Sequence, residues 1–267
     1  MIDSFTWVQA VARAGYFSRG VVYAIISFFA ILASLGAASS KGSEGALATL
    51  LAQPFGIVLI GIMACGLAGF SAWRLIQAVM DADNHGHAPR ALVVRLALLT
   101  SAATYATLAV TALTLAVSLP GSGGSGQTSL GVLDAIVHFA GVRVFATLLS
   151  LLFLGIALAH WWKVLTGKYS RHFDEDEAPM RLVHAASVLG LGARGVVFAL
   201  LAAMVWLGIE GAPSSPSEIP GTQEALRYIQ QLPYGQPLLF ALAVGLMIFA
   251  GYSFIEARWR KVDVSFT

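Results

Sequence analysis

Charged residues are scarce in this chain. Asp, Glu, Lys and Arg make up only 11% of its 267 residues, whereas soluble domains contain about a quarter. The single cysteine, Cys65, excludes a disulfide scaffold, and the net charge of +2 is too small to indicate a nucleic-acid partner. Apolar side chains are abundant instead, at 57% of residues with a mean hydropathy of +0.76. This composition excludes disorder and predicts an integral membrane protein.

Six long stretches with almost no charged residues predict six membrane-spanning helices. A helix needs about 20 mostly apolar residues to cross the hydrocarbon core, whereas the strands of a membrane barrel are only about ten alternating residues long. The predicted helices cover residues 18–39, 54–78, 93–119, 141–165, 186–209 and 235–257. The sequence therefore predicts an all-α, polytopic membrane protein with a single membrane domain over residues 1–267.

The positions of the basic residues predict the orientation of the chain. All but three of the 16 Lys and Arg residues fall on the side that holds both termini. The three on the other side are Lys41, Arg143 and Arg227. Because loops rich in Lys and Arg stay in the cytoplasm, we expect both termini to be cytoplasmic.

Three shorter segments predict helices that lie on the membrane surface. Residues 1–14 lack the pattern of a cleavable signal and place several apolar side chains on one helical face, which is typical of an interfacial amphipathic helix. These side chains are Phe5, Val8, Val11 and Ala12. Residues 43–52 and 222–232 predict two more amphipathic helices, on the opposite surface, where they would cap the bundle.

Two parts of the chain repeat one motif. Residues 15–24 and 190–199 share the pattern G-x-x-x-R-G-V-V-aromatic-A, and residues 53–56 and 232–235 share proline, aromatic and glycine in succession. The middle part is a weaker copy, with Ser101 where the motif has arginine. We expect three parallel hairpin repeats, over about residues 12–83, 89–168 and 184–262. Parallel repeats are related by an axis along the membrane normal, which allows either a pseudo-threefold ring or a linear arrangement.

The repeat motif resembles that of a bacterial membrane-protein family called domain of unknown function 1206. The unit of that family is A-R-x-G-Y-x-A-R-G-V-V-Y, followed by a loop and P-x-G-x-x-L, and residues 12–23 match it closely. The resemblance covers nearly the whole chain as three tandem units, and the middle unit departs from it at Ser101. It implies the repeat architecture and the inner membrane of a bacterium, and it implies no catalytic residues.

Two arginines recur within the repeats. Arg19 and Arg194 both lie near the predicted cytoplasmic end of the first helix of their hairpin. The guanidinium offers a planar fork that fits phosphate, which makes both residues candidates for binding an anion or a lipid headgroup. The alternative is a structural one, in which each arginine anchors its helix at the interface or pairs with carbonyls at a helix C-terminus.

A stripe of hydroxyl groups follows one face of the third predicted helix. Its members are spaced alternately by four and three residues, so they share that face over the whole span. They are Thr100, Thr104, Thr107, Thr111, Thr114 and Ser118. The stripe could line a path for water or a small solute, or it could be a packing face on which small hydroxyls allow a close approach of helices.

Few ionisable side chains fall inside the predicted spans, and none of the acids lies at the middle of the membrane. The candidates are His160, His184 and Glu256, all within two turns of an interface, where long side chains reach water easily. A haem between His160 and His184 is conceivable, as is a metal in the loop of residues 81–87. The interpretation favoured by the sequence has neither cofactor nor metal.

Motifs of the common enzyme classes are absent from the sequence, so we expect no enzymatic activity. Two functions are left. The first is a structural or accessory membrane protein that binds lipids, a partner membrane protein or further copies of itself. The alternative is a transporter or channel for ions or small solutes, with a path lined by the third helix. The lack of charge at the middle of the membrane favours the first.

Overall fold

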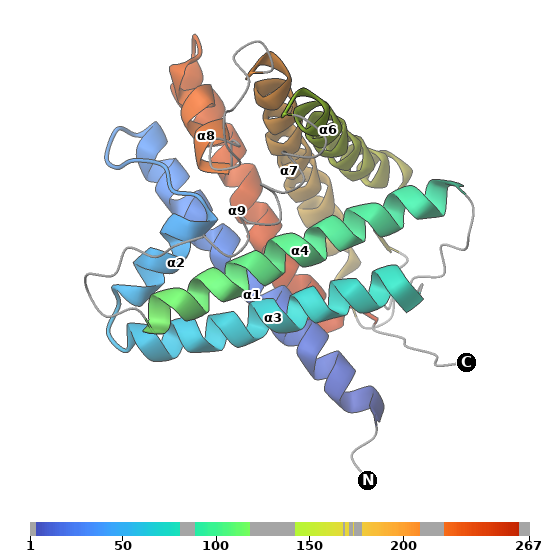
Figure 1. Ribbon diagram of the computed structural model, residues 1–267. Coiled ribbons are helices and arrows are strands. Elements are labelled where there is room, and N and C mark those ends of the chain that lie inside the picture. Colours follow the sequence, from blue (N-terminus) through green and yellow to red (C-terminus); the bar gives the residue numbers. More distant parts are fainter. Residues whose placement is uncertain are drawn as a thin grey trace.

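The computed structural model describes residues 4–80, 89–117, 142–167, 169–170, 173, 178–208 and 222–261 (Figure 1). This part of the chain forms eight helices and no sheet, with one isolated bridge between Phe173 and Arg260. The helices are α1 (Ser4–Ser34), α2 (Ser43–Leu51), α3 (Gly56–Met80), α4 (Pro89–Val117), α6 (Val142–Thr166), α7 (Met180–Gly208), α8 (Thr222–Gln231) and α9 (Gly235–Trp259). The predicted all-α class is confirmed.

Six of these helices are long and apolar enough to cross a membrane: α1, α3, α4, α6, α7 and α9. Each has at least 25 residues, more than the roughly 20 that a span requires. Large apolar side chains on them point outward; Ile62, Leu148 and Leu207 are 64%, 60% and 67% exposed. Lipid is the solvent that suits such surfaces, so the protein is a multi-pass membrane protein, as predicted.

The first helix differs from its predicted bounds at both ends. α1 begins at Ser4 and continues without a break to Ser34, so residues 4–14 extend the first spanning helix and do not form a helix of their own. At its other end, α1 stops before the predicted residue 39 because Gly36 adopts φ = +73°. The N–H groups of Gly36 and Ala37 donate back to carbonyls of the last turn, which is the Schellman ending that glycine favours.

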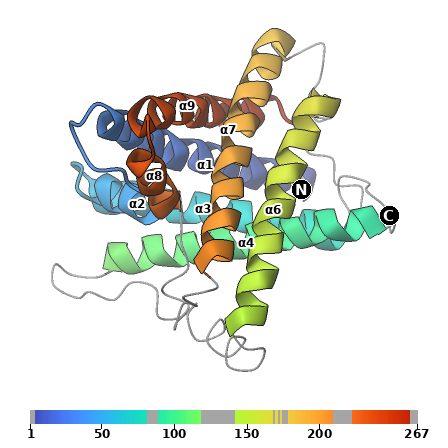
Figure 2. The ribbon, with the colours of Figure 1, turned by 90° about the horizontal axis from the view of Figure 1, so that it is seen from above.

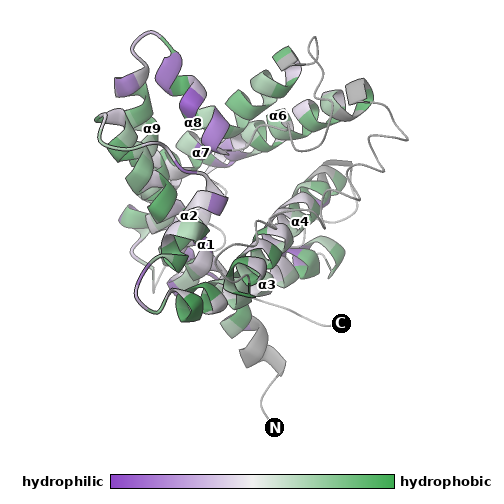
Figure 3. Ribbon diagram, turned by 60° about the vertical axis from the view of Figure 1, so that its left-hand side comes forward, coloured by the Kyte–Doolittle hydropathy of each residue, from purple (hydrophilic) through white to green (hydrophobic). Residues whose placement is uncertain are grey.

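The six long helices have a defined order of neighbours. α1 lies along α9, α3 along α4, and α6 along α7; α1 also packs on α3, and α7 on α9. Figure 2 shows α6 and α7 side by side, running across the direction of α3 and α4. Figure 3 shows the α3–α4 pair and the α6–α7 pair as two separate arms on one side of α9. The centre that joins the two arms is the antiparallel pair α1 and α9.

This order of neighbours bears on the predicted ring. In a threefold ring, the second long helix of each hairpin packs on the first helix of the next, as in α3–α4, α6–α7 and α9–α1. The two helices within a hairpin should also pack together, as α1–α3 and α7–α9 do. Helices α4 and α6 make no comparable contact within the part of the chain that the structure describes. The middle hairpin is therefore open, and a closed threefold ring is not confirmed.

The first and third hairpins are held together by matching glycines. Gly15 on α1 lies against Phe70 on α3, where a Cβ atom would come within 2.6 Å of the Phe70 Cα. Gly190 on α7 lies in the same way against Phe249 on α9, where the corresponding distance is 2.7 Å. Small residues let helices in a membrane approach closely. This close approach explains why the repeated motif begins with glycine in both hairpins.

A matching turn also leads into the second long helix of these two hairpins. Phe55 and Tyr234 both have φ = +60°, in the left-handed region that bulky residues rarely adopt. The glycine that follows each of them is required, because a Cβ on Gly56 or Gly235 would come within 1.8 or 2.3 Å of a carbonyl oxygen of the preceding short helix. The sequence of proline, aromatic and glycine thus encodes the same turn twice.

The short helices α2 and α8 form where the sequence predicts them. α2 packs on α1, α3 and α4, and α8 packs on α7 and α9. The backbone N–H of Gly42 donates to Oε1 of Gln223 at 3.4 Å, and Nε2 of Gln230 donates to the carbonyl of Ala33 at 3.3 Å. Figure 3 shows hydrophilic residues gathered on α8. These contacts connect the first and third hairpins at the end of the bundle where α1 ends and α9 begins.

Candidate functional site

A buried ion pair joins α1 to α9. The side chains of Arg19 and Glu256 are each only 3% exposed. Nη2 of Arg19 donates to Oε2 of Glu256, and Nε of Arg19 donates to Oγ of Ser253 at 3.1 Å. Nη1 of Arg260 donates to the other carboxylate oxygen of Glu256 at 2.6 Å. A single carboxylate therefore binds two guanidinium groups and connects the first helix of the chain to the last.

Aromatic rings enclose the guanidinium of Arg19. Its Cζ lies 5.0 Å from the ring centroids of Tyr16 and Phe249 and 5.2 Å from that of Phe70. Cation–π contacts contribute up to about 2 kcal/mol where water is excluded. With its hydrogen bonds directed at α9 and its faces covered by rings, Arg19 has a geometry that favours a role in helix packing over the predicted binding of lipid.

Arg194 is the counterpart of Arg19 in the third hairpin, and its surroundings differ. Its Cζ lies 5.2, 5.4 and 4.7 Å from the ring centroids of Tyr23, Phe198 and Phe249. The side chain is partly exposed, and its Nε atom is buried without a hydrogen-bond partner. No carboxylate among the described residues pairs with it. Arg194 thus resembles Arg19 in its aromatic surroundings but lacks the acid.

The order of the helices explains this difference. α1 packs on α9, where Glu256 lies, whereas α7 packs on α6. Gly20 on α1 lies against Phe254 of α9, and the equivalent Gly195 on α7 lies against Trp161 of α6. Lys163, two residues after Trp161, therefore occupies the position of Glu256. Lys163 carries a positive charge where Glu256 carries a negative one. The third hairpin therefore repeats the cation of the first without a matching anion.

Another arginine increases the excess of positive charge. The Cζ of Arg74 lies 4.8 Å from the ring centroid of Phe70, and its Nη1 donates to Oε1 of Gln77 at 3.2 Å. Glu256 is the only acid in the described residues of the six long helices. The cluster thus contains one carboxylate and four guanidinium groups: those of Arg19, Arg74, Arg194 and Arg260. A net positive region of this kind attracts anions.

The predicted hydroxyl stripe lies on α4. Thr111 is buried and Thr104 is exposed, with the other described members between these extremes; Ser118 lies outside the described residues. Four of the hydroxyls donate to carbonyls of their own helix at 2.9–3.1 Å. They belong to Thr100, Thr104, Thr107 and Thr114. Because these bonds stay within α4, they favour neither a solute path nor a packing face, and both interpretations stay predictions.

The two candidate histidines lie far apart. The ring of His160 stacks on that of Phe198, with 5.8 Å between centroids. Nδ1 of His184 bonds the hydroxyl of Tyr169, and burial raises the pKa of that tyrosine, so the hydroxyl stays protonated at neutral pH. Because Phe198 follows His184 by fourteen residues on α7, the imidazoles are separated by roughly 21 Å along the helix axis. One haem iron cannot bind both.

The loop proposed for a metal, residues 81–87, lies outside the described residues. In the part of the chain that the structure describes, no group of three or more His, Cys, Asp or Glu side chains comes together. The described residues with the most concentrated chemistry are therefore the arginines around Glu256.

Comparison with known proteins agrees with this architecture. A family model described as Domain of Unknown Function (DUF1206) matches residues 14–81 and 189–260, which are the first and third hairpins and together make up just over half of the chain. The "Uncharacterized protein YxxB" of Bacillus subtilis (strain 168) is 26% identical over 259 residues, which cover 96% of this chain and 92% of that protein. No solved structure matches the chain. The chain is a multi-pass membrane protein that belongs to the DUF1206 family.

Proposed function

We propose that this protein is a non-catalytic membrane protein that binds the phosphate group of anionic lipids at Arg194. The observation that carries the proposal is the contrast between the two repeated arginines: Arg19 is paired with Glu256, whereas Arg194 has no carboxylate among the described residues and a buried Nε without a partner. A guanidinium in this state gains more from an anion than one that is already paired.

The depth of Arg194 in the membrane supports a lipid as the source of the anion. α7 ends at Gly208, and about 20 residues cross the hydrocarbon core, so the other boundary of the core falls near residue 189. Arg194 then lies little more than one turn inside this boundary, where a long side chain reaches the headgroups. Its guanidinium fork matches the geometry of a phosphate.

The rest of the cluster supports a scaffold role. Glu256 and its two arginines connect α1 to α9, so this side of the cluster stabilises the bundle while Arg194 is left to bind. We place the protein in the bacterial cytoplasmic membrane with both termini inside, because most basic residues lie on that side. Reporter fusions at the C-terminus test this orientation; activity of an external reporter would contradict it.

The binding of lipid is tested by native mass spectrometry of the full chain, released from micelles that contain equal amounts of phosphatidylglycerol and phosphatidylcholine. We expect retained phosphatidylglycerol to exceed phosphatidylcholine, and Arg194→Gln to lower that ratio about fivefold, since one basic residue contributes about 1 kcal/mol. Arg194→Lys keeps the charge and should keep most of the preference.

Two outcomes would overturn the proposal. The first is an unchanged lipid ratio in Arg194→Gln. The second is thermal stabilisation by inorganic phosphate, in lipid-free micelles, that equals the stabilisation by phosphatidylglycerol and disappears in Arg194→Gln. That result would show that Arg194 takes a soluble anion and not a lipid.

A further inference from the structure

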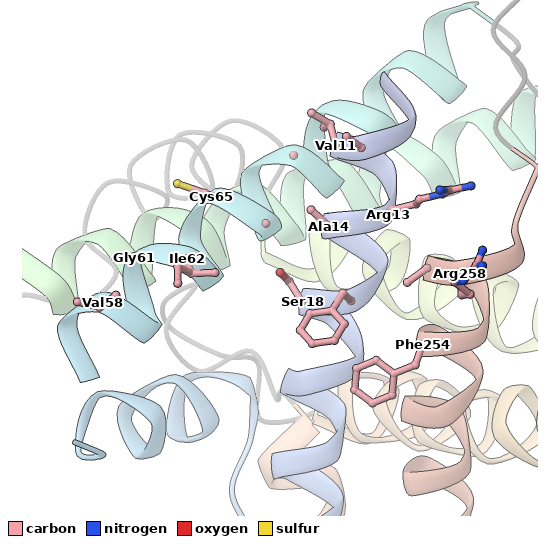
Figure 4. Close-up of a pocket in the computed structure, with 15 residues that line it drawn as sticks. Val11, Arg13, Ala14, Ser18, Val58, Gly61, Ile62, Cys65, Phe254 and Arg258 are labelled. Carbon is pink, nitrogen blue, oxygen red and sulfur yellow. The ribbon is translucent and has the colours of Figure 1, made fainter. Parts of the chain in front are cut away.

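An open apolar groove runs between α1, α3 and α9, away from Arg194 (Figure 4). Its volume is about 1140 Å³, and its walls are almost entirely apolar. Representative lining residues are Phe17 on α1, Ile62 and Cys65 on α3, and Phe254 on α9. The rings of Phe17 and Phe254 pack against each other at 5.2 Å between centroids and form one edge of the groove.

Glycines on α3 give the groove its depth. Gly61, Gly66 and Gly69 all line it. Gly66 and Gly69 bring α3 close to α1, because a Cβ atom added to them would lie 1.8 Å from Oγ of Ser18 and 3.0 Å from the Val11 side chain. A Cβ atom added to Gly61 would have no neighbour within 4 Å, so the absence of a side chain there leaves open space. The groove is thus a consequence of the sequence of α3.

Two arginines stand at one end of this groove. Arg13 on α1 and Arg258 on α9 both line it, and both are exposed. Figure 4 shows their side chains extending to the same side, away from Val58, Ile62 and Cys65. None of the lining residues is an acid. The groove therefore combines a long apolar wall with an uncompensated positive end.

The length of the apolar wall fits one lipid tail. From Gly69, beside Val11 at the arginine end, to Val58 the groove follows eleven residues of α3, or roughly 16 Å of helix. One leaflet of the hydrocarbon core is about 15 Å thick. An acyl chain laid along α3 would therefore reach from the positive end to Val58.

From this combination we propose that the groove binds one anionic phospholipid. Its phosphate lies between Arg13 and Arg258, and an acyl chain lies along α3 against Ile62 and Cys65. This site goes beyond the binding at Arg194, because it shares no residue with that site and either can exist without the other. A zwitterionic lipid fits the apolar wall equally well, so the arginines confer the selectivity.

The test uses lipid probes with a photoactivatable diazirine in the acyl chain, added to the full chain in phosphatidylcholine vesicles. We expect a phosphatidylglycerol probe to cross-link to residues 58–69 about 30-fold more than a phosphatidylcholine probe, since each arginine contributes roughly fivefold. The double variant Arg13→Gln/Arg258→Gln should bring the two yields within about twofold of each other. Arg181→Gln, an exposed arginine outside the groove, is the matched control and should keep the preference.

A second variant tests whether the lipid binds in the groove itself or is only attracted by the charge of the arginines. Gly61→Leu fills open space and should reduce cross-linking of both probes to this segment while it leaves the chain folded. Equal yields for the two probes in the unmodified chain would overturn the proposal, as would a preference that survives the double variant. Oxidation that links two chains through their single Cys65 would also overturn it, because the groove would then be an interface between copies.

Discussion

The first and third hairpins share one motif but use its arginine differently. In both, a glycine brings the two long helices together and a left-handed aromatic leads into the second one. In the first hairpin the arginine meets Glu256 on α9, whereas in the third it lies among aromatic rings, and Lys163 occupies the equivalent position of α6. A repeated residue therefore acquires its role from the helix that packs on it, and the difference between these neighbours separates a structural cation from a binding one.

The largest expected effect comes from removal of the shared carboxylate. Glu256→Gln leaves Arg19 and Arg260 buried beside a neutral amide, and we expect the free energy of unfolding in micelles to fall by about 3–5 kcal/mol. Lys163→Gln changes the equivalent position of α6, which is exposed, and should have a much smaller effect. Equal stability of the two variants would show that the ion pair at α1 and α9 does not distinguish the hairpins.

The second-largest expected effect comes from variants that test whether the first and third hairpins pack in the same way. Gly15→Ala and Gly190→Ala each force a Cβ into a helix backbone, and both should destabilise the protein by about 1–3 kcal/mol in denaturant unfolding. Gly192→Ala and Gly251→Ala meet open space and should stabilise their helices by up to about 1 kcal/mol. Destabilisation by Gly15→Ala but not by Gly190→Ala would contradict the structural equivalence of the first and third hairpins.

The matching turns allow a finer comparison. At Phe55 and Tyr234 the left-handed backbone penalises any residue with a Cβ by about 1–2 kcal/mol relative to glycine. Phe55→Gly should therefore be more stable than Phe55→Ala by about this amount, and the pair of variants at Tyr234 should show the same difference. Thermal unfolding of the four variants measures it; a difference at only one turn contradicts the equivalence.

The smallest expected effect comes from a variant that gives α6 an acid like the one on α9. Lys163→Glu supplies α6 with the acid that α9 has, and the new carboxylate should pair with Arg194 in place of lipid phosphate. We expect the preference for phosphatidylglycerol at Arg194 to fall about fivefold, or roughly 1 kcal/mol, relative to Lys163→Gln as the neutral control. Retention of the preference in Lys163→Glu would mean that Arg194 is not the residue that the lipid contacts.

Much of the fold followed from local sequence because the bilayer imposes simple rules. Long apolar stretches must become helices that satisfy their own backbone, so the number of spans, the short helices α2 and α8 and the repeated motif were all predictable. The ends of the helices were less predictable. The separate N-terminal helix was predicted from an amphipathic face, but no proline lies between residues 4 and 34, and α1 continues through Gly15 and Gly20.

Contacts between distant helices were not predictable from the same rules. Arg19 and Glu256 were both candidates, yet they are separated by 237 residues, and nothing in either local sequence shows that α1 lies along α9. The groove with Arg13 and Arg258 was missed for the same reason, since each of its walls is an ordinary apolar helix. Only the combination of three helices gives it a shape and a charged end.

The sequence by itself determined the solvent, the helices and the places where helices approach closely, because composition, hydropathy and glycine act over a few residues. The tertiary structure alone decided which helices are neighbours, and therefore which buried charges have a partner of opposite charge. A buried guanidinium requires a partner within a few ångströms; the packing order gave a carboxylate to Arg19 and, among the residues that the structure describes, none to Arg194.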